Sequence, residues 1–240
     1  MSLFSRLVGA GALADAFSVA FRIPNLLRDL LAEGALSSAF VPTFTAELVN
    51  EDKSQAELLA RLTTGAVLVV SGGLTLLGLL FAEELVLAIT EGWSAEKVAF
   101  TAELTRIMMP ILTFVSLGAV WMGMLNSHRR FVVPALAPAV FNLVSIAVGV
   151  FLLIAGLPGP EAVMAWSIGT LVAGACQCGL QLPVLARMGY RVWPKIRGLT
   201  KHPGVRRIAR LMLPAVAGVA AVQLNIFVNT RFAASLGDGP

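Results

Sequence analysis

Residues 14–42 read ADAFSVAFRIPNLLRDLLAEGALSSAFVP, and this stretch decides which fold the chain adopts. Its background of Ala, Phe, Leu, Val and Ile is that of a membrane-spanning helix. Charged side chains nevertheless interrupt it, at Asp15, Arg22, Arg28, Asp29 and Glu33. A charge near the bilayer centre costs about 2.5–3.5 kcal/mol on insertion scales, so charges in such a segment usually serve a function. The stretch therefore predicts a membrane helix with a functional polar face.

The composition of the whole chain is that of a membrane protein. Hydrophobic residues make up 57% of its 240 residues and charged residues 13%, with a mean hydropathy of +0.82. A soluble domain carries about 25% charged residues, so this chain has too little polar surface to be one. Barrel-type alternation is absent, and only helices satisfy their backbone hydrogen bonds within one segment. The sequence therefore predicts an all-α polytopic membrane protein.

Uncharged stretches define most of the expected spans, because a helix needs about 20 mostly apolar residues to cross a bilayer. They are 62–81, 107–127, 131–160, 162–186 and 211–230. The charged segment 14–49 is a further candidate, which we expect to kink at Pro24 and to break near Glu33–Gly34. We predict a single transmembrane lobe over 1–240, with about six spans at 14–49, 58–88, 99–127, 132–156, 160–187 and 205–236 and a basic loop at 188–204.

Charges in the connections between these spans alternate in sign. Lys and Arg gather near residue 53, at Arg129–Arg130 and over 187–210, whereas the connections near 90 and 159 are acidic or nearly uncharged. Basic connections stay in the cytoplasm, so this order predicts the topology of the lobe. The loop at 188–204 reads as an anchor on anionic lipid, worth about 1 kcal/mol per basic residue, rather than as a nucleic-acid site.

The charged helix carries its polar groups in two directions. Asp15, Arg22 and Asp29 are seven residues apart, nearly two helical turns, so they share one stripe. Arg28 lies on another side, with Asn25 one turn before it. Lipid cannot cover both directions, so at least one of them must face water or a polar seam of the bundle.

Two interpretations of these charges remain open. In the first, Asp15–Arg22 and Arg28–Glu33 are neutralising pairs in a packed helix. In the second, the helix lines a polar path that binds an anionic group. Arginine suits phosphate because its planar guanidinium stays charged and donates two hydrogen bonds at once.

No catalytic or metal-binding pattern accompanies the charged helix. The sequence has no Ser–His–Asp arrangement, no metal-ligand spacing and no Gly-rich phosphate loop. Cys176 and Cys178 would point to nearly opposite sides of a helix, so they cannot chelate one metal together. We therefore expect no enzyme activity, no cofactor and no metal. Uphill transport by such a chain would draw on an ion gradient or on the membrane potential.

The motifs of the charged segment closely resemble those of MurJ-type (MviN-type) lipid II flippases. They are Asp-Ala-Phe at 15–17, Pro-Asn-Leu-Leu-Arg at 24–28, Ala-Glu-Gly-Ala at 32–35 and Ala-Phe-Val-Pro at 39–42. Further agreement lies in MLNSHRRFVVPALAPAVFNLVSI at 124–146, in QLPVLARMGY at 181–190, and in LMLPAVAGVAAVQLNIFVNTRFAASL at 211–236. The resemblance runs nearly from end to end.

This resemblance implies a member of the multidrug/oligosaccharidyl-lipid/polysaccharide exporter superfamily in the bacterial cytoplasmic (inner) membrane. Such proteins have two helical lobes around a cationic cavity, and they move lipid-linked peptidoglycan precursor to the outer leaflet by alternating access. The resemblance places the functional arginine on Arg28, the functional aspartate on Asp15, a basic position on Arg22 and the motif glutamate on Glu33. With Asn25 beside them, these residues form the predicted substrate site.

The resemblance also carries expectations about partners and completeness. The expected partners are the lipid-linked precursor, membrane lipids, and a second lobe or cell-wall synthesis proteins, with no nucleic acid. The chain corresponds to the N-terminal lobe without the first helix, and MSLFSRLVGAGALAD does not read as a cleavable signal peptide. The alternatives are a cation-coupled exporter of drugs or of other lipid-linked oligosaccharides, and a non-transporting truncated membrane fragment.

Overall fold

The structure, a computed structural model, describes residues 11–31, 35–50, 52–157 and 159–235. It gives the backbone alone at residues 30, 31, 50, 223, 224 and 226–235. Every regular element in these ranges is a helix, which confirms the predicted all-α class. The helices are α2 (Ala12–Leu31), α3 (Ala35–Asn50), α4 (Lys53–Leu80), α5 (Ala82–Leu87), α6 (Ala95–Met108), α7 (Ile111–Ser127), α8 (Val132–Ala155), α9 (Gly159–Gly179), α10 (Leu182–Arg187) and α11 (Pro203–Ser235).

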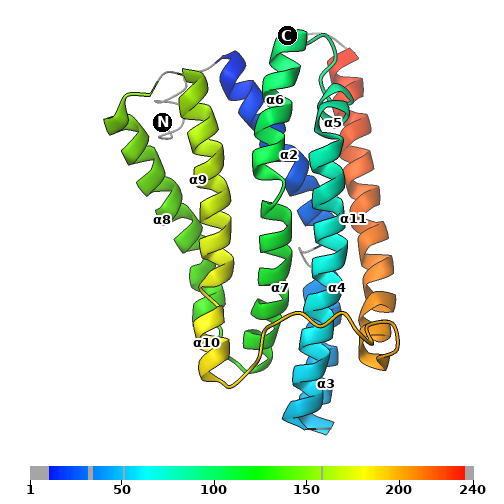
Figure 1. Cartoon of the computed structure of the whole chain (residues 1–240). Coiled ribbons are helices and arrows are strands. Elements are labelled where there is room, and N and C mark those ends of the chain that lie inside the picture. Colours follow the sequence, from blue (N-terminus) through cyan, green and yellow to red (C-terminus); the bar gives the residue numbers. More distant parts are fainter. Residues whose placement is uncertain (1–10, 32–34, 51, 158, 236–240) are drawn as a thin grey trace.

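The long helices run side by side in one bundle (Figure 1). Helix α6 continues into α7, and α9 continues into α10, so that each pair forms one long rod. Helices α2 and α3 lie on either side of residues 32–34, which are outside the described residues. In the view of Figure 1, α2 passes behind the row formed by α6, α7 and α4.

Three of the predicted spans contain breaks in their helices. The span predicted at 58–88 is interrupted at Phe81, and the span at 160–187 is interrupted after Gly179. The span at 99–127 is interrupted at Met109–Pro110, because proline has no N–H group to continue the helical hydrogen bonds. Helices α4 and α6 begin before the predicted spans at 58 and 99, because each starts at a polar cap outside the apolar run.

Asp52 caps the first of these early starts. Its carboxylate accepts hydrogen bonds from the backbone N–H groups of Ser54 (2.7 Å) and Gln55 (3.0 Å), which fixes the start of α4 at Lys53. The Ser54 hydroxyl also donates to this carboxylate. These hydrogen bonds, the hydroxyl bond first, lower the pKa of Asp52 below its usual value. The cap therefore stays charged and suits the positive end of the helix dipole.

Four described helical segments are long and apolar enough to cross a membrane: Lys53–Leu80, Ala95–Ser127, Val132–Ala155 and Gly159–Arg187. Of these four segments, α8 has the smallest share of buried residues. Its exposed side chains are large and apolar, among them Leu143, Phe151 and Ile154. A helix that is apolar all round and packs on one side alone is suited to lipid on its other sides.

A buried apolar cluster joins the half of the bundle that holds α3. Phe40 and Phe44 of α3 stack at 5.2 Å between ring centroids, and they pack with Leu59, Met124 and Leu185. These residues come from α3, α4, α7 and α10, so the cluster fixes four helices together. Two smaller clusters attach α2 to α5, α6, α7 and α9.

Residues 190–201, which we call the strap, cross the bundle between α10 and α11 (Figure 1). The backbone N–H of Lys195 donates to the carbonyl of Arg61 (2.9 Å), and Nε of Arg61 donates to the carbonyl of Trp193 (3.2 Å). Gly65 allows this contact, because a Cβ atom there would lie 2.3 Å from the carbonyl oxygen of Lys195. The strap is therefore held on α4 by its hydrogen bonds with Arg61 and by the close approach at Gly65.

Tyr190 attaches the beginning of the strap to the rest of the lobe. Its hydroxyl is 2.9 Å from Nε2 of His128, whose Nδ1 is 2.8 Å from the carbonyl of Met124. Lys53 lies over the Tyr190 ring at 5.2 Å, and its ammonium donates to the carbonyl of Met188. Burial, and then the charge of Glu57, raises the pKa of Tyr190, so its hydroxyl stays protonated.

Gly65→Ala should loosen the strap and destabilise the protein, because the new methyl group meets a backbone carbonyl that cannot rotate away. Overpacking of this kind costs about 1–3 kcal/mol. Thermal unfolding of the purified chain in detergent measures the loss. Gly72→Ala is the matched control on the same helix, since nothing lies within 4 Å of its Cβ position. Equal melting temperatures for the two variants would contradict the close contact at Gly65.

Candidate functional site

A polar stripe runs along the exposed face of α2. It consists of Asp15, Ser18, Arg22, Asn25 and Asp29, spaced alternately by three and four residues. The first three are exposed and the last two are half-buried. Residues at this spacing lie on one side of a helix. The predicted stripe of Asp15, Arg22 and Asp29 is therefore present, with two further polar groups on it.

The opposite face of α2 holds the helix in the lobe. Ala16 and Ala20 are fully buried, in a cluster with Leu104 and Met108 of α6 and Val163 of α9. Small residues such as these alanines let membrane helices approach closely, and van der Waals packing then holds the helices together. Since the apolar face is used for packing inside the lobe, the polar stripe must point away from it.

Arg28 joins the stripe through its neighbour Asp29. Its Nε and Nη2 atoms lie 3.2 Å and 2.9 Å from the same carboxylate oxygen, Oδ1 of Asp29. The two side chains remain 30% and 29% exposed. The two polar directions expected from the sequence thus meet at one ion pair, because the long arginine side chain reaches around the helix.

Asn25 lies next to Pro24 and bonds within its own helix. Its amide Nδ2 donates to the carbonyl of Phe21, one turn earlier, at 2.9 Å. Pro24 supplies no backbone N–H, yet α2 continues through it to Leu31. The amide therefore ties the helix together where the backbone is one hydrogen bond short.

Asp15 pairs with a residue that sequence reasoning missed. Its Oδ2 atom lies 3.1 Å from Nζ of Lys97 on α6, and that ammonium sits 3.7 Å from the centroid of the Trp93 ring. The Asp15–Arg22 pair of the packing interpretation is therefore wrong. Two helical turns separate those side chains along the stripe, whereas α6 brings Lys97 alongside Asp15.

The sequence held one weak signal for this partner. Trp93 and Lys97 are four residues apart in GWSAEK, a spacing that places a cation over an aromatic ring at the start of a helix. The signal does not say which helix the ammonium reaches, because that depends on how α2 packs against α6.

The two remaining predicted site residues are Arg22 and Glu33, and of these the structure describes Arg22 alone. Arg22 is exposed on the stripe, and within the described ranges it has no hydrogen-bond or ion-pair partner. Glu33 lies outside the described residues. The site as described therefore contains one arginine beside a carboxylate and one with an open guanidinium. Among the described residues, no three His, Cys, Asp or Glu side chains gather as metal ligands.

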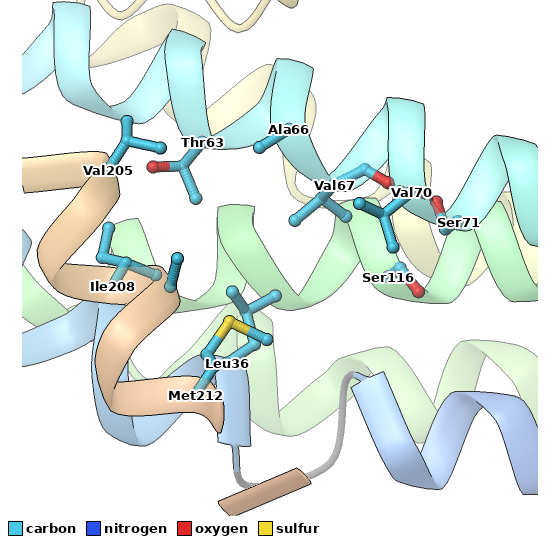
Figure 2. A pocket seen from close by; sticks show the side chains of 11 residues that line it. Leu36, Thr63, Ala66, Val67, Val70, Ser71, Ser116, Val205, Ile208 and Met212 are labelled. Carbon is cyan, nitrogen blue, oxygen red and sulfur yellow. Dashed lines mark hydrogen bonds between the residues drawn. The ribbon is translucent and has the colours of Figure 1, made fainter. Parts of the chain in front are cut away.

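A separate cavity of about 150 Å³ lies between α3, α4, α7 and α11 (Figure 2). Its lining is apolar apart from Thr63, Ser71 and Ser116, and it contains no charged side chain. The hydroxyls of Thr63 and Ser116 are buried without a partner among the described residues. An anionic head group would find no cation here, so this cavity is not an alternative to the stripe on α2.

The fold and the stripe together define a class of protein. A bundle of apolar helices with an arginine-bearing polar helix on its surface is a lobe of a polytopic membrane protein. A solved structure of "Lipid II flippase MurJ, inward closed conformation" has this fold: its TM-score is 0.73 at 22% identity, over 93% of this chain and 45% of that one.

Residues 4–239 match the family "Lipid II flippase MurJ", and the chain belongs to this family. The lipid II flippase MurJ of Burkholderia cenocepacia is 37% identical over 99% of the chain. The probable lipid II flippase MurJ of Treponema pallidum is 36% identical over 98%. The chain covers 46% and 44% of these two proteins, so it spans about half the length of the curated relatives it matches. Its family and its apolar helices make it a multi-pass protein of the bacterial cytoplasmic membrane.

The Asp15–Lys97 pair should show measurable coupling in a double-mutant cycle of unfolding free energies. With Asp15 60% exposed, we expect about 0.2–1 kcal/mol between Asp15→Asn and Lys97→Met. Asp15→Asn with Arg22→Gln is the control cycle, and its coupling should be near zero. Coupling of Asp15 to Arg22 instead of Lys97 would contradict the Asp15–Lys97 pair and support the Asp15–Arg22 pair of the packing interpretation.

Proposed function

We propose that this protein takes part in moving lipid-linked peptidoglycan precursor, lipid II, from the inner to the outer leaflet of the cytoplasmic membrane by alternating access. It would thereby support cell-wall synthesis as a transporter rather than as an enzyme. The polar stripe on α2 would form part of the substrate path. The observation that carries the proposal is the pair of arginines, Arg22 and Arg28, on a helix whose apolar face is already used for packing.

The charges on the stripe suit an anionic cargo. A guanidinium donates parallel hydrogen bonds to two oxygens of a diphosphate, and the bond is stronger because both groups are charged. Arg28 is already oriented by Asp29, which occupies its Nε and Nη2 donors at one carboxylate oxygen. A diphosphate offers more acceptor oxygens and more charge than this carboxylate, so it would compete for the same donors.

Exchange between these two anions gives the site a simple cycle. With no cargo, Asp29 neutralises Arg28 and limits the cost of holding a cation in the membrane. With cargo bound, the diphosphate takes over Arg28, and Arg22 on the same stripe adds a second positive charge. Asp15, held by Lys97, would tie the far end of the stripe to α6. A change in the packing of α2 on α6 would then break the Asp15–Lys97 contact at this end of the stripe.

Arg28→Ala should abolish support of cell-wall synthesis in cells that depend on the gene for this chain, with normal amounts of protein in the membrane. Arg28→Lys should restore little, because it keeps the charge and loses the planar fork. Hydrogen bonds to charged groups contribute about 1.5–3 kcal/mol, or roughly ten- to a hundredfold in binding. Growth and binding of lipid II to the purified protein are measured together.

Arg130→Ala is the matched control for this experiment, since it removes an exposed arginine that lies off α2. It should leave both growth and lipid II binding unchanged. Full growth and unaltered lipid II binding in a well-expressed Arg28→Ala protein would contradict the proposed role of Arg28. Loss of binding to a neutral lipid-linked sugar as well would indicate general damage to the fold.

The proposal also needs the predicted topology, in which basic connections are cytoplasmic. Cysteines at Arg130 and Arg197 should be protected from an impermeant maleimide in intact cells, and a cysteine at Glu96 should react. Glu96 is preferred to Gly92, whose φ of +78° disfavours a side chain. Cys176→Ala removes the exposed natural thiol. Reaction at position 197 from outside would overturn the topology.

A further inference from the structure

A large apolar pocket lies beneath the strap, apart from the polar stripe on α2. Its volume is about 620 Å³. The pocket is lined by Thr64 of α4, Leu117 and Trp121 of α7, Leu182 of α10, and Val192 and Trp193 of the strap. Ligand pockets in proteins span about 300–1,000 Å³, so this one has the size of a binding site.

The pocket has few polar groups, and they differ in whether they have a hydrogen-bond partner. The Thr64 hydroxyl donates to the carbonyl of Ala60 in its own helix at 2.8 Å. The indole N–H of Trp121 is buried and has no acceptor among the described residues. The wall of the pocket is therefore almost wholly apolar and suits a hydrocarbon chain.

The rim of the pocket is positively charged. Arg61 reaches the carbonyl of Trp193, so its guanidinium lies where the strap meets α4. The strap itself carries Arg191, Lys195, Arg197 and Lys201 and contains no Asp or Glu. The nearest carboxylate on α4 is Glu57, one turn before Arg61. Positive charge therefore prevails at the opening.

The strap also presents large apolar side chains to its surroundings. Trp193 is 76% exposed and Ile196 is 57% exposed, and they alternate with the basic residues. Tryptophan collects at the boundary between lipid tails and head groups, and Lys and Arg are attracted there by anionic lipids. This combination fits a lipid better than a peptide or a nucleotide, because apolar and basic groups adjoin along one segment.

We propose that the pocket beneath the strap binds an anionic glycerophospholipid of the leaflet that the strap faces. One acyl chain occupies the apolar pocket. The phosphate lies at the rim, among Arg61, Arg191 and Arg197. This lipid is a resident of the protein rather than its cargo, so the proposal does not depend on lipid II transport.

The test uses the purified 240-residue chain in nanodiscs, with phospholipids brominated on the acyl chain as quenchers. The chain has four tryptophans, and a single-tryptophan variant keeps Trp121 alone. Trp121 is buried, so only a chain that enters the pocket quenches it. Brominated phosphatidylglycerol in a phosphatidylcholine background should quench it at a low mole fraction, and brominated phosphatidylcholine should not.

Two sets of variants separate the pocket from its rim. Ala186→Phe fills the pocket and should abolish the quenching. Arg191→Gln with Arg197→Gln should weaken the preference for phosphatidylglycerol roughly ten- to thirtyfold, because each removes a charge-assisted hydrogen bond to the phosphate at the rim. The control pair, Arg129→Gln with Arg130→Gln, removes the same charge elsewhere and should keep the preference.

The wild-type chain provides a second readout if the single-tryptophan variant does not fold. In that case, the quenching by phosphatidylglycerol should fall when Trp121→Phe is introduced. Equal quenching by both lipids would overturn the proposal, and so would quenching that Ala186→Phe leaves intact. An equal effect of the strap pair and the control pair would assign the preference to overall charge and contradict the site.

Discussion

A charged helix in a membrane can bury only one of its faces against its own lobe, and this constraint governs the arrangement of α2. Its alanine face is fully buried against α6 and α9. The stripe from Asp15 to Asp29 is consequently left on the outside of the lobe. Lipid would penalise those charges, so the stripe needs water, a second helical lobe or an anionic ligand opposite it. The remaining helices supply the packing that keeps α2 in this orientation.

The charges of the stripe are kept in place by two different local arrangements. At one end, Asp15 is held by Lys97, whose ammonium also lies on the Trp93 ring. At the other end, Arg28 is held by its neighbour Asp29. The first contact joins two helices and the second lies within one. Movement of α2 against α6 would break the first and leave the second, whereas binding of an anion would break the second and leave the first.

Much of this could be predicted from the sequence, because composition and spacing are local properties. The lack of charge in the long stretches predicted a helical membrane protein. The spacing of seven residues between Asp15, Arg22 and Asp29 predicted that they share one stripe. The resemblance of the motifs predicted the family to which the chain belongs. The break at Phe81 was missed because the apolar run continues through it.

What could not be predicted depends on contacts between distant parts of the chain. Nothing in GWSAEK tells that Lys97 reaches Asp15, because the pair forms only after α2 packs on α6. The contact between Gly65 and the carbonyl of Lys195 could not be predicted either. In the sequence, a glycine within a helix indicates only a low helix propensity. The roles of Arg28, Arg22, Asp15, Asn25 and Glu33 in substrate binding stay predictions.

The most direct test of the central claim is the water accessibility of neighbouring positions on α2. In a chain with Cys176 and Cys178 replaced by alanine, Arg22→Cys and Ile23→Cys are each treated with a water-soluble maleimide in reconstituted membranes. Arg22 is on the exposed stripe and Ile23 is 4% exposed on the packed face. The account predicts that the cysteine at position 22 reacts and the cysteine at position 23 does not. An unreactive cysteine at position 22, which reacts only after denaturation, would mean that the stripe faces lipid, and would contradict the account.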